Sequence, residues 1–172
     1  DGTGPRRPFF VCVGTIEPRK NHALLLDLWE EMGSDAPGLV IAGNRGWKNE
    51  DVFARLDALP ADGPVRVAHG LSDGAIAALM AGSCGLLFPT HAEGFGLPAI
   101  EAAALGVPIV ANDLPVFREV LGNIPIYAKV TDRYLWKKKI EALAKNGPKP
   151  APDTQFHPPT WDTHFKTVLR LT

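Results

Sequence analysis

The sequence predicts a doubly wound α/β domain in which helices cover both faces of a six-stranded parallel, Rossmann-like sheet. Short apolar runs alternate six times with longer amphipathic runs, the pattern expected when each strand is followed by a helix. The run GLLFP, residues 85–89, is apolar throughout, as a strand covered on both faces should be. The chain has 172 residues, a length that suits one domain, and we take this domain to span residues 1–172.

The strands expected from these runs are residues 9–14, 39–43, 65–69, 85–89, 108–112 and 125–128, the last being the weakest. Helices are expected at residues 21–32, 51–59, 116–121 and 132–145, with two more beginning near Ser72, a good N-cap, and at Pro98, which suits the first helical position. Residues 1–7 are interpreted as a linker. The Pro-rich stretch from residue 148 is interpreted as a tether, and residues 161–171 as a last helix.

Charge and composition exclude several classes of protein. A net charge of −1 gives no basic field, so we expect no nucleic-acid partner. The most apolar stretch, residues 75–88, is interrupted at Gly82 and falls short of the ~20 residues of a bilayer span. Cys12 and Cys84 lie in apolar runs and are expected to be buried reduced thiols, which favours a cytoplasmic protein.

Ligands of such folds bind at the carboxyl ends of the strands. This rule selects the loops at residues 14–20, 43–47, 70–72 and 90–97, each of which contains a glycine. The first loop lacks the spaced glycines of a dinucleotide fingerprint, so an NAD-dependent oxidoreductase is disfavoured.

The fourth of these loops organises the chain, because it places Glu93 and Glu101 on either side of a Gly-Phe-Gly-Leu-Pro turn. Gly94 and Gly96 allow a close backbone approach, and the following helix start offers unpaired N–H groups to an anion such as phosphate. Glu101 could accept hydrogen bonds from sugar hydroxyls. Helical spacing predicts a sheet-facing side formed by Ile100, Ala103, Ala104 and Val107.

Two cations in the first loop, Arg19 and Lys20, could clamp a diphosphate from the other side of the cleft. On its own this pair could equally be a solvated turn in which Asn21 caps the next helix. Of Trp47 we expect that it anchors its loop rather than flanks a base. We interpret the lysines at 137–139 as the solvated face of a helix, with contact to anionic lipid as the alternative.

Taken together, VGTIEPRKN, LVIAG followed by GW, HGLSD, LLFPTHAEGFGLPAIEAAALGVPIVAND and REVLG resemble the C-terminal domain of family 4 retaining glycosyltransferases, which have two Rossmann-like domains. The resemblance spans about residues 9–143. Its most specific part is the pattern of a glutamate, seven residues and a second glutamate at Glu93 and Glu101. In that family this domain holds the nucleotide-diphosphate sugar.

The resemblance implies a role for each matched position. Arg19 and Lys20 would bind the leaving diphosphate, Glu93 would meet the transferred sugar, and Glu101 would accept the ribose hydroxyls. No metal or other cofactor is implied. The remaining donor-binding positions are backbone or turn residues from the four loops, namely Gly14, Thr15, Gly43, Gly70, Leu71, Gly94, Phe95, Gly96 and Leu97.

Two departures from the family pattern bear on function. Thr15 stands where many relatives carry an arginine, and the N-terminal domain that binds the acceptor is not among these 172 residues. We therefore expect the donor-binding half of a hexosyltransferase, which is inactive alone and acts with an acceptor-binding domain in the same or a separate chain. The phrase GTIEPRKN favours GDP-mannose by resemblance only.

The expected acceptor is a glycan or lipid-linked acceptor, and the expected location is cytoplasmic with peripheral contact to the inner membrane face. One alternative is a non-catalytic module that binds a sugar nucleotide or scaffolds a partner enzyme. Another is a glycosidase that uses Glu93 and Glu101 as acid and base.

Overall fold

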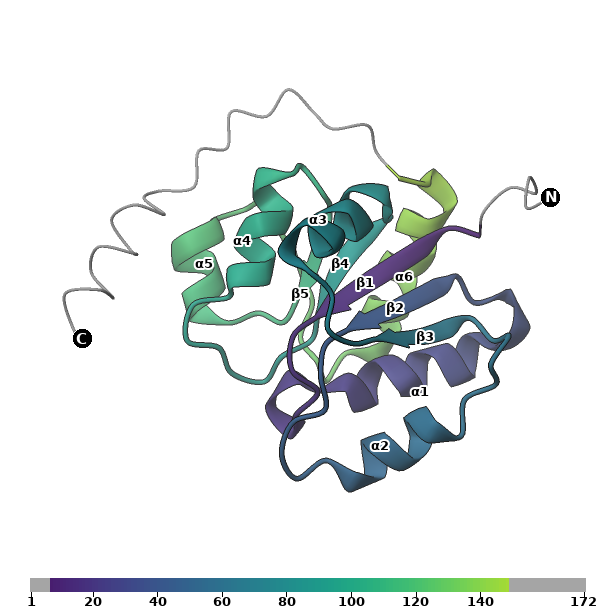
Figure 1. Cartoon of the computed structure of the whole chain (residues 1–172). Coiled ribbons are helices and arrows are strands. Elements are labelled where there is room, and N and C mark those ends of the chain that lie inside the picture. The colour runs from purple at the N-terminus through teal and green to yellow at the C-terminus, as the bar shows by residue number, and fades with distance from the viewer. Residues whose placement is uncertain (1–6, 149–172) are drawn as a thin grey trace.

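The computed structural model describes residues 7–148, which form a single parallel sheet covered by helices on both faces (Figure 1). The strands lie in the order β3-β2-β1-β4-β5-β6 and every pairing is parallel. Their bounds are β1 Phe9–Val13, β2 Gly38–Ala42, β3 Val65–Ala68, β4 Gly85–Phe88, β5 Ile109–Ala111 and β6 Ile126–Tyr127. The predicted fold class is confirmed, and the strand order reverses between β1 and β4, where such folds bind ligands.

The helices alternate with the strands as the sequence predicts. They are α1 His22–Met32, α2 Glu50–Asp57, α3 Asp73–Gly82, α4 Leu97–Ala104, α5 Pro115–Leu121 and α6 Arg133–Asn146, with short 3-10 turns η1 Pro18–Lys20 and η2 Gly33–Asp35. Residues 1–6 of the predicted linker and residues 149–172, with the predicted tether and last helix, lie outside the described residues.

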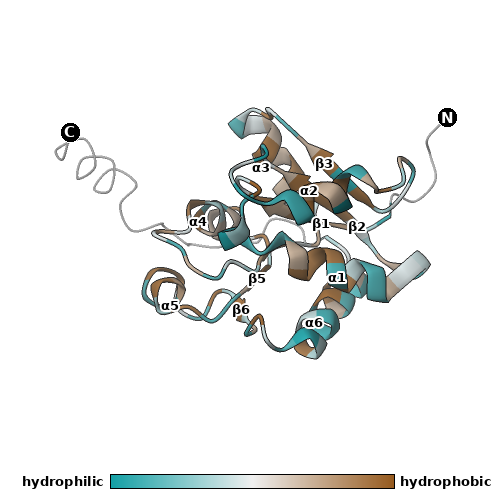
Figure 2. Cartoon of the chain, turned by 90° about the horizontal axis from the view of Figure 1, so that it is seen from below, coloured by the Kyte–Doolittle hydropathy of each residue, from teal (hydrophilic) through white to brown (hydrophobic). Residues whose placement is uncertain are grey.

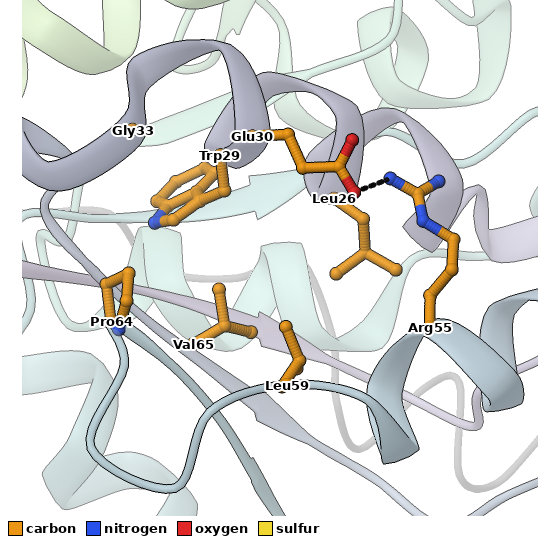
Figure 3. Close-up of a pocket in the computed structure, with 8 residues that line it drawn as sticks. All are labelled: Leu26, Trp29, Glu30, Gly33, Arg55, Leu59, Pro64 and Val65. Atoms are coloured by element: carbon orange, nitrogen blue, oxygen red, sulfur yellow. Dashed lines mark hydrogen bonds and ion pairs between the residues drawn. The ribbon is translucent and has the colours of Figure 1, made fainter.

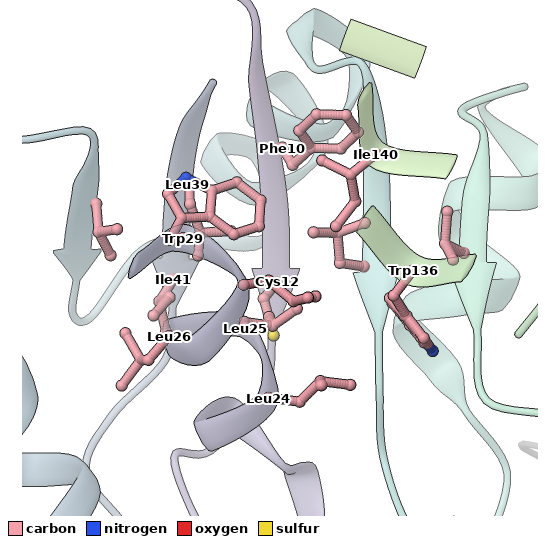
Figure 4. Packing of buried hydrophobic residues seen from close by; sticks show 14 of the residues in the cluster. Phe10, Cys12, Leu24, Leu25, Leu26, Trp29, Leu39, Ile41, Trp136 and Ile140 are labelled. Carbon is pink, nitrogen blue, oxygen red and sulfur yellow. The ribbon is translucent and has the colours of Figure 1, made fainter. Parts of the chain in front are cut away.

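Successive residues of β1 point to opposite faces of the sheet and so enter two separate cores. Phe10 and Cys12 pack in the cluster that α1, α2 and α6 cover, around the buried rings of Trp29 and Trp136 (Figure 4). Val11 packs in the cluster that α3, α4 and α5 cover. Both cysteines are buried and free, as predicted.

Local signals place the helix that follows β4. Its N-cap is Gly96, and Pro98 is the second helical residue rather than the first, still within the turn whose N–H groups lack intrahelical partners. The prediction that Ala104 faces the sheet is wrong, since this residue is exposed. The buried residues of α4 are Ala99, Ile100, Ala102 and Ala103. Ala104 lies three residues after Glu101 and seven after Leu97, both exposed, and therefore stands with them on the solvent side of the helix.

None of the Asp, Glu, Lys or Arg residues within residues 7–148 is fully buried, and the large apolar side chains of Trp47 and Tyr134 are exposed among them. Figure 2 shows the hydrophilic residues along α6. On this helix Lys138 is exposed, and its ammonium lies 5.3 Å from the centre of the Tyr134 ring. No helix within residues 7–148 is both long enough and apolar enough to cross a bilayer.

Candidate functional site

The loops after β1 and β2 continue side by side beyond the end of the sheet. Ile16 forms a parallel bridge with Arg45, and the Gly14 N–H donates a 3.0 Å hydrogen bond to the Ala42 carbonyl. A Cβ on Gly43 would lie 1.9 Å from the Gly14 oxygen, so no side chain fits there. The structure thus brings Gly14 and Gly43 into contact and leaves Thr15 exposed beside them.

A single turn sends the two adjacent cations of the first loop in different directions. Residues Pro18–Lys20 form η1, and Asn21 follows in the left-handed region with φ 60°. Asn21 occupies the N-cap position of α1, yet its side-chain amide donates to the Pro89 carbonyl at 3.1 Å and does not cap the helix. Arg19 is half exposed and pairs with Glu17 at 3.0 Å.

Lys20 turns inward and forms an ion pair with Glu93 of the loop after β4. The side chains are 12% and 8% exposed, so water screens this pair far less than the surface pairs. The Lys20 ammonium also lies 5.5 Å from the centre of the Phe88 ring, and its stem runs along Gly14. Lys20, predicted to hold the diphosphate, and Glu93, predicted to meet the sugar, therefore come together where β1 and β4 end, whereas Arg19 pairs with Glu17 instead.

The glycine turn presents backbone donors beside this ion pair. Gly96 has φ +76°, and a Cβ there would lie 2.6 Å from the Phe117 ring, so glycine is required by the turn's own packing. Gly94 faces open space. Among residues 7–148 no hydrogen-bond acceptor is found for the backbone N–H groups of Gly94, Gly96 and Leu97, and they precede or begin α4, whose positive dipole end attracts anions. Phe95 is half-buried between them.

Glu101 lies one turn into α4 and is exposed. Partial burial of its carboxyl group, together with the negative charge of Asp73 at the start of α3, raises the pKa of Glu101. No hydrogen bond or ion pair within residues 7–148 joins Glu101 to Glu93, so the two glutamates have separate surroundings.

The loop after β3 is joined to the loop after β2. The Gly70 N–H donates to the Asn44 side chain at 3.2 Å, and His69 Nδ1 lies 2.8 Å from the Gly43 carbonyl oxygen. Gly70 has φ +63° and Leu71 is half-buried. The four predicted loops thus lie along one edge of the sheet. Lys20 and Glu93 lie on one side of Gly14, and Gly43 and Gly70 lie on the other.

Other predictions about this edge need correction or addition. Trp47 is 76% exposed, so the expectation that it anchors its loop is wrong: the bridge from Ile16 to Arg45 holds the loop instead. Sequence reasoning missed Thr90, which is fully buried next to Glu93, and His22, which is buried beneath Lys20. A threonine directly after an apolar strand was the available signal for Thr90.

A pocket of about 190 Å³ lies elsewhere, where α1 and α2 end and β3 begins (Figure 3). Trp29, Leu59 and Val65 line its apolar wall, and an Arg55–Glu30 ion pair closes one side. It contains none of the predicted site residues.

Known proteins resemble this chain in sequence and in fold. The model of the family Glycosyl transferases group 1 matches residues 2–152. The serotype-specific mannosyltransferase WbdA of Escherichia coli is 33% identical over 175 aligned residues, which cover 84% of this chain and 22% of that protein. The O-antigen chain mannosyltransferase RfbU of Salmonella typhimurium is 31% identical over 78% of this chain and 38% of its own length.

Solved structures share the fold at low sequence identity. TarM has a TM-score of 0.68 at 17% identity, with 85% of this chain and 30% of TarM covered. Anabaena Alr3699/HepE, solved in complex with UDP-glucose, has a TM-score of 0.68 at 18% identity, with 81% of this chain and 40% of that chain covered.

The chain spans only 22% of the length of WbdA and 38% of the length of RfbU. Because the family model matches most of its residues, the chain belongs to the group 1 glycosyl transferases.

Proposed function

We propose that this chain is the donor-binding half of a retaining hexosyltransferase, with GDP-mannose as the donor. The observation that carries this proposal is the Lys20–Glu93 ion pair beside the backbone N–H groups of Gly94, Gly96 and Leu97, for which the described part of the chain provides no acceptor. A cation and backbone N–H donors on one edge of the sheet fit a diphosphate, and a carboxylate next to them fits a sugar hydroxyl. The mannosyltransferases among the relatives support mannose as the sugar.

In this proposal the diphosphate sits between Lys20 and the N-terminus of α4. An ammonium group has three hydrogens, so Lys20 can keep its bond to Glu93 and still donate to a phosphate oxygen. The Gly94, Gly96 and Leu97 amides donate from the other side. The Glu93 carboxylate receives a hydroxyl of the sugar, and Glu101 receives the ribose hydroxyls.

During transfer the bond between the anomeric carbon and the phosphate oxygen breaks, and the acceptor hydroxyl oxygen bonds to that carbon. The hydroxyl proton leaves with the diphosphate, which takes up the electron pair of the broken bond. Negative charge therefore grows next to Lys20 and the amides, and each such group contributes about 2–4 kcal/mol to transition-state stabilisation. We propose that these groups stabilise that charge without a metal, so transfer by the whole protein should survive EDTA.

The whole protein's acceptor half is proposed to be an N-terminal domain, in the same or a separate chain. This proposal is supported by the greater length of the relatives. We place the whole protein in the cytoplasm at the inner membrane face, where the lysines of α6 could approach anionic lipid and a glycan or lipid-linked acceptor could be reached.

Calorimetry on the 172-residue chain tests donor binding. We expect heat with GDP and GDP-mannose, weaker heat with UDP or dTDP, and loss of most binding in Glu101→Ala. Glu141→Ala, an equally exposed helical glutamate on α6, is the matched control and should bind like the wild type. Absence of heat with every nucleotide would refute the proposed function. A preference for UDP would refute only the choice of GDP-mannose as the donor and would leave the rest of the proposal standing.

A further inference from the structure

Thr90 follows Pro89 just past the end of β4 and is fully buried. Its hydroxyl lies near three acceptors: the Ala92 carbonyl at 2.8 Å, the Arg19 carbonyl at 3.1 Å and Glu93 Oε1 at 3.4 Å. A hydroxyl has one hydrogen and can fully satisfy one acceptor at a time. The shortest contact, to Ala92, is therefore the principal bond.

These acceptors have a common relation to the ion pair. Ala92 directly precedes Glu93, and Arg19 directly precedes Lys20, so the hydroxyl contacts the backbone on both sides of the pair. The neighbouring His91 N–H also donates to the Arg19 carbonyl, at 2.9 Å. One short segment after β4 thus holds the first and fourth loops together.

Thr90 is itself held from the next strand. The buried side chain of Asn112 donates from Nδ2 to the Thr90 carbonyl at 3.0 Å. The Asn112 Oδ1 accepts from the backbone N–H groups of Asp113 and Val130, at 3.0 and 3.2 Å. A chain of hydrogen bonds thus runs from the end of β5 through Thr90 to the site.

We propose that Thr90 is a positioning residue whose hydroxyl sets the Lys20–Glu93 ion pair in place before any donor binds. Its importance for donor binding rests on the proposed function, whereas the placement of the pair does not. Valine has nearly the shape of threonine and no donor, so Thr90→Val should release the turn that carries Glu93 and expose the Lys20 ammonium.

Chemical labelling reads this placement without any ligand. Acetylation of lysines, measured by peptide mass spectrometry, should be slow at Lys20 relative to the exposed Lys138 in the same molecule. Thr90→Val should raise the ratio of the Lys20 rate to the Lys138 rate about tenfold, the equivalent of one lost hydrogen bond. Thr90→Ser, which keeps the hydroxyl, should leave this ratio at the wild-type value. An unchanged ratio in the folded Thr90→Val chain would overturn the proposal. Should the valine chain fail to fold, Thr90→Ala removes the same hydroxyl and gives the same readout.

A double-mutant cycle separates positioning from general loosening. Glu93→Gln alone should expose Lys20, and Thr90→Val added to it should cause no further increase if Thr90 acts through the pair. Equal increases on both backgrounds would mean that Thr90 only stiffens the loop, and would overturn the proposal.

Calorimetry then links the placement to the donor. Thr90→Val should lower the affinity for GDP-mannose relative to GDP by about tenfold, because Glu93 meets the sugar, and Thr90→Ser should not. If the wild type binds neither compound, the proposed function fails, while the Lys20 labelling still decides the role of Thr90. If the wild type binds and the ratio stays constant in Thr90→Val, the positioning role fails.

Discussion

His22 should make the stability of this domain depend on pH. Its side chain is 1% exposed at the first position of α1, and neither ring nitrogen has a hydrogen-bond partner within residues 7–148. The pKa of His22 is lowered to about 4, chiefly by burial and secondly by the positive charge of Lys20, while the negative charge of Glu17 opposes both. The folded state therefore keeps this imidazole neutral.

The sign follows from which state binds the proton. An unfolded histidine titrates near pH 6.5, so between that pH and about 4 the unfolded chain binds a proton that the folded chain does not. The contribution of His22 is fully present above the unfolded pKa and is lost as the pH falls. Between about pH 7.5 and about pH 4.5 the loss amounts to roughly 2.5 kcal/mol.

Urea unfolding at several pH values, followed through the buried Trp29 and Trp136, measures this loss. His22→Gln keeps a polar side chain that does not titrate, and His22→Phe keeps a ring. Because all other titrating groups remain, the difference between wild type and either variant isolates His22. Wild type should lose about 2.5 kcal/mol more than the variants on acidification. Curves that stay parallel would show that His22 is not held neutral, and the reasoning would be refuted.

Three further predictions concern the site. Gly43→Ala should destabilise the fold by about 1–3 kcal/mol or more, since its Cβ would meet the Gly14 carbonyl, whereas Gly94→Ala, in open space, should change the free energy of unfolding by less than about 0.5 kcal/mol in urea titrations. Trp47→Ala should likewise leave that free energy within about 0.5 kcal/mol, because the ring is exposed; a larger loss would mean that the ring anchors its loop after all. The affinity for GDP, measured by calorimetry, should fall when acidification protonates Glu101. Because the pKa of Glu101 is raised, this fall should begin at a higher pH than it would with an ordinary glutamate, and Glu101→Gln should make the affinity depend less on pH.

The sheet could be predicted from sequence because its signals are local. Each strand is a short apolar run, and each following loop carries a glycine or a polar residue that ends it. Residues 7–148 contain six strands at the six predicted places, and no strand bound differs from its prediction by more than one residue. The two-residue strand β6 is also at its predicted place. A proline precedes Ile126 and Tyr127, and it is tolerated there because β6 is an edge strand.

The site was less predictable because it depends on contacts between distant residues. Nothing in the sequence says which of Arg19 and Lys20 turns inward, since the choice is made by η1 and by the left-handed Asn21. The environment of Thr90 likewise depends on a loop 71 residues away. The prediction for Ala104 was wrong because the buried face of α4 is turned toward Ala99 and Ala102, whereas spacing counted from Ile100 places Ala104 on the same face.

The two adjacent cations also differ in what it costs to redirect them. The Arg19–Glu17 pair is exposed, and such pairs contribute only about 0–1 kcal/mol, so Arg19 can leave Glu17 for a phosphate at little cost. The Lys20–Glu93 pair is nearly buried, and separating it would leave an uncompensated charge, at about 3–5 kcal/mol. A donor should therefore add to the Lys20–Glu93 pair rather than break it. We therefore expect Arg19 to move when the proposed donor binds and Lys20 to stay in place.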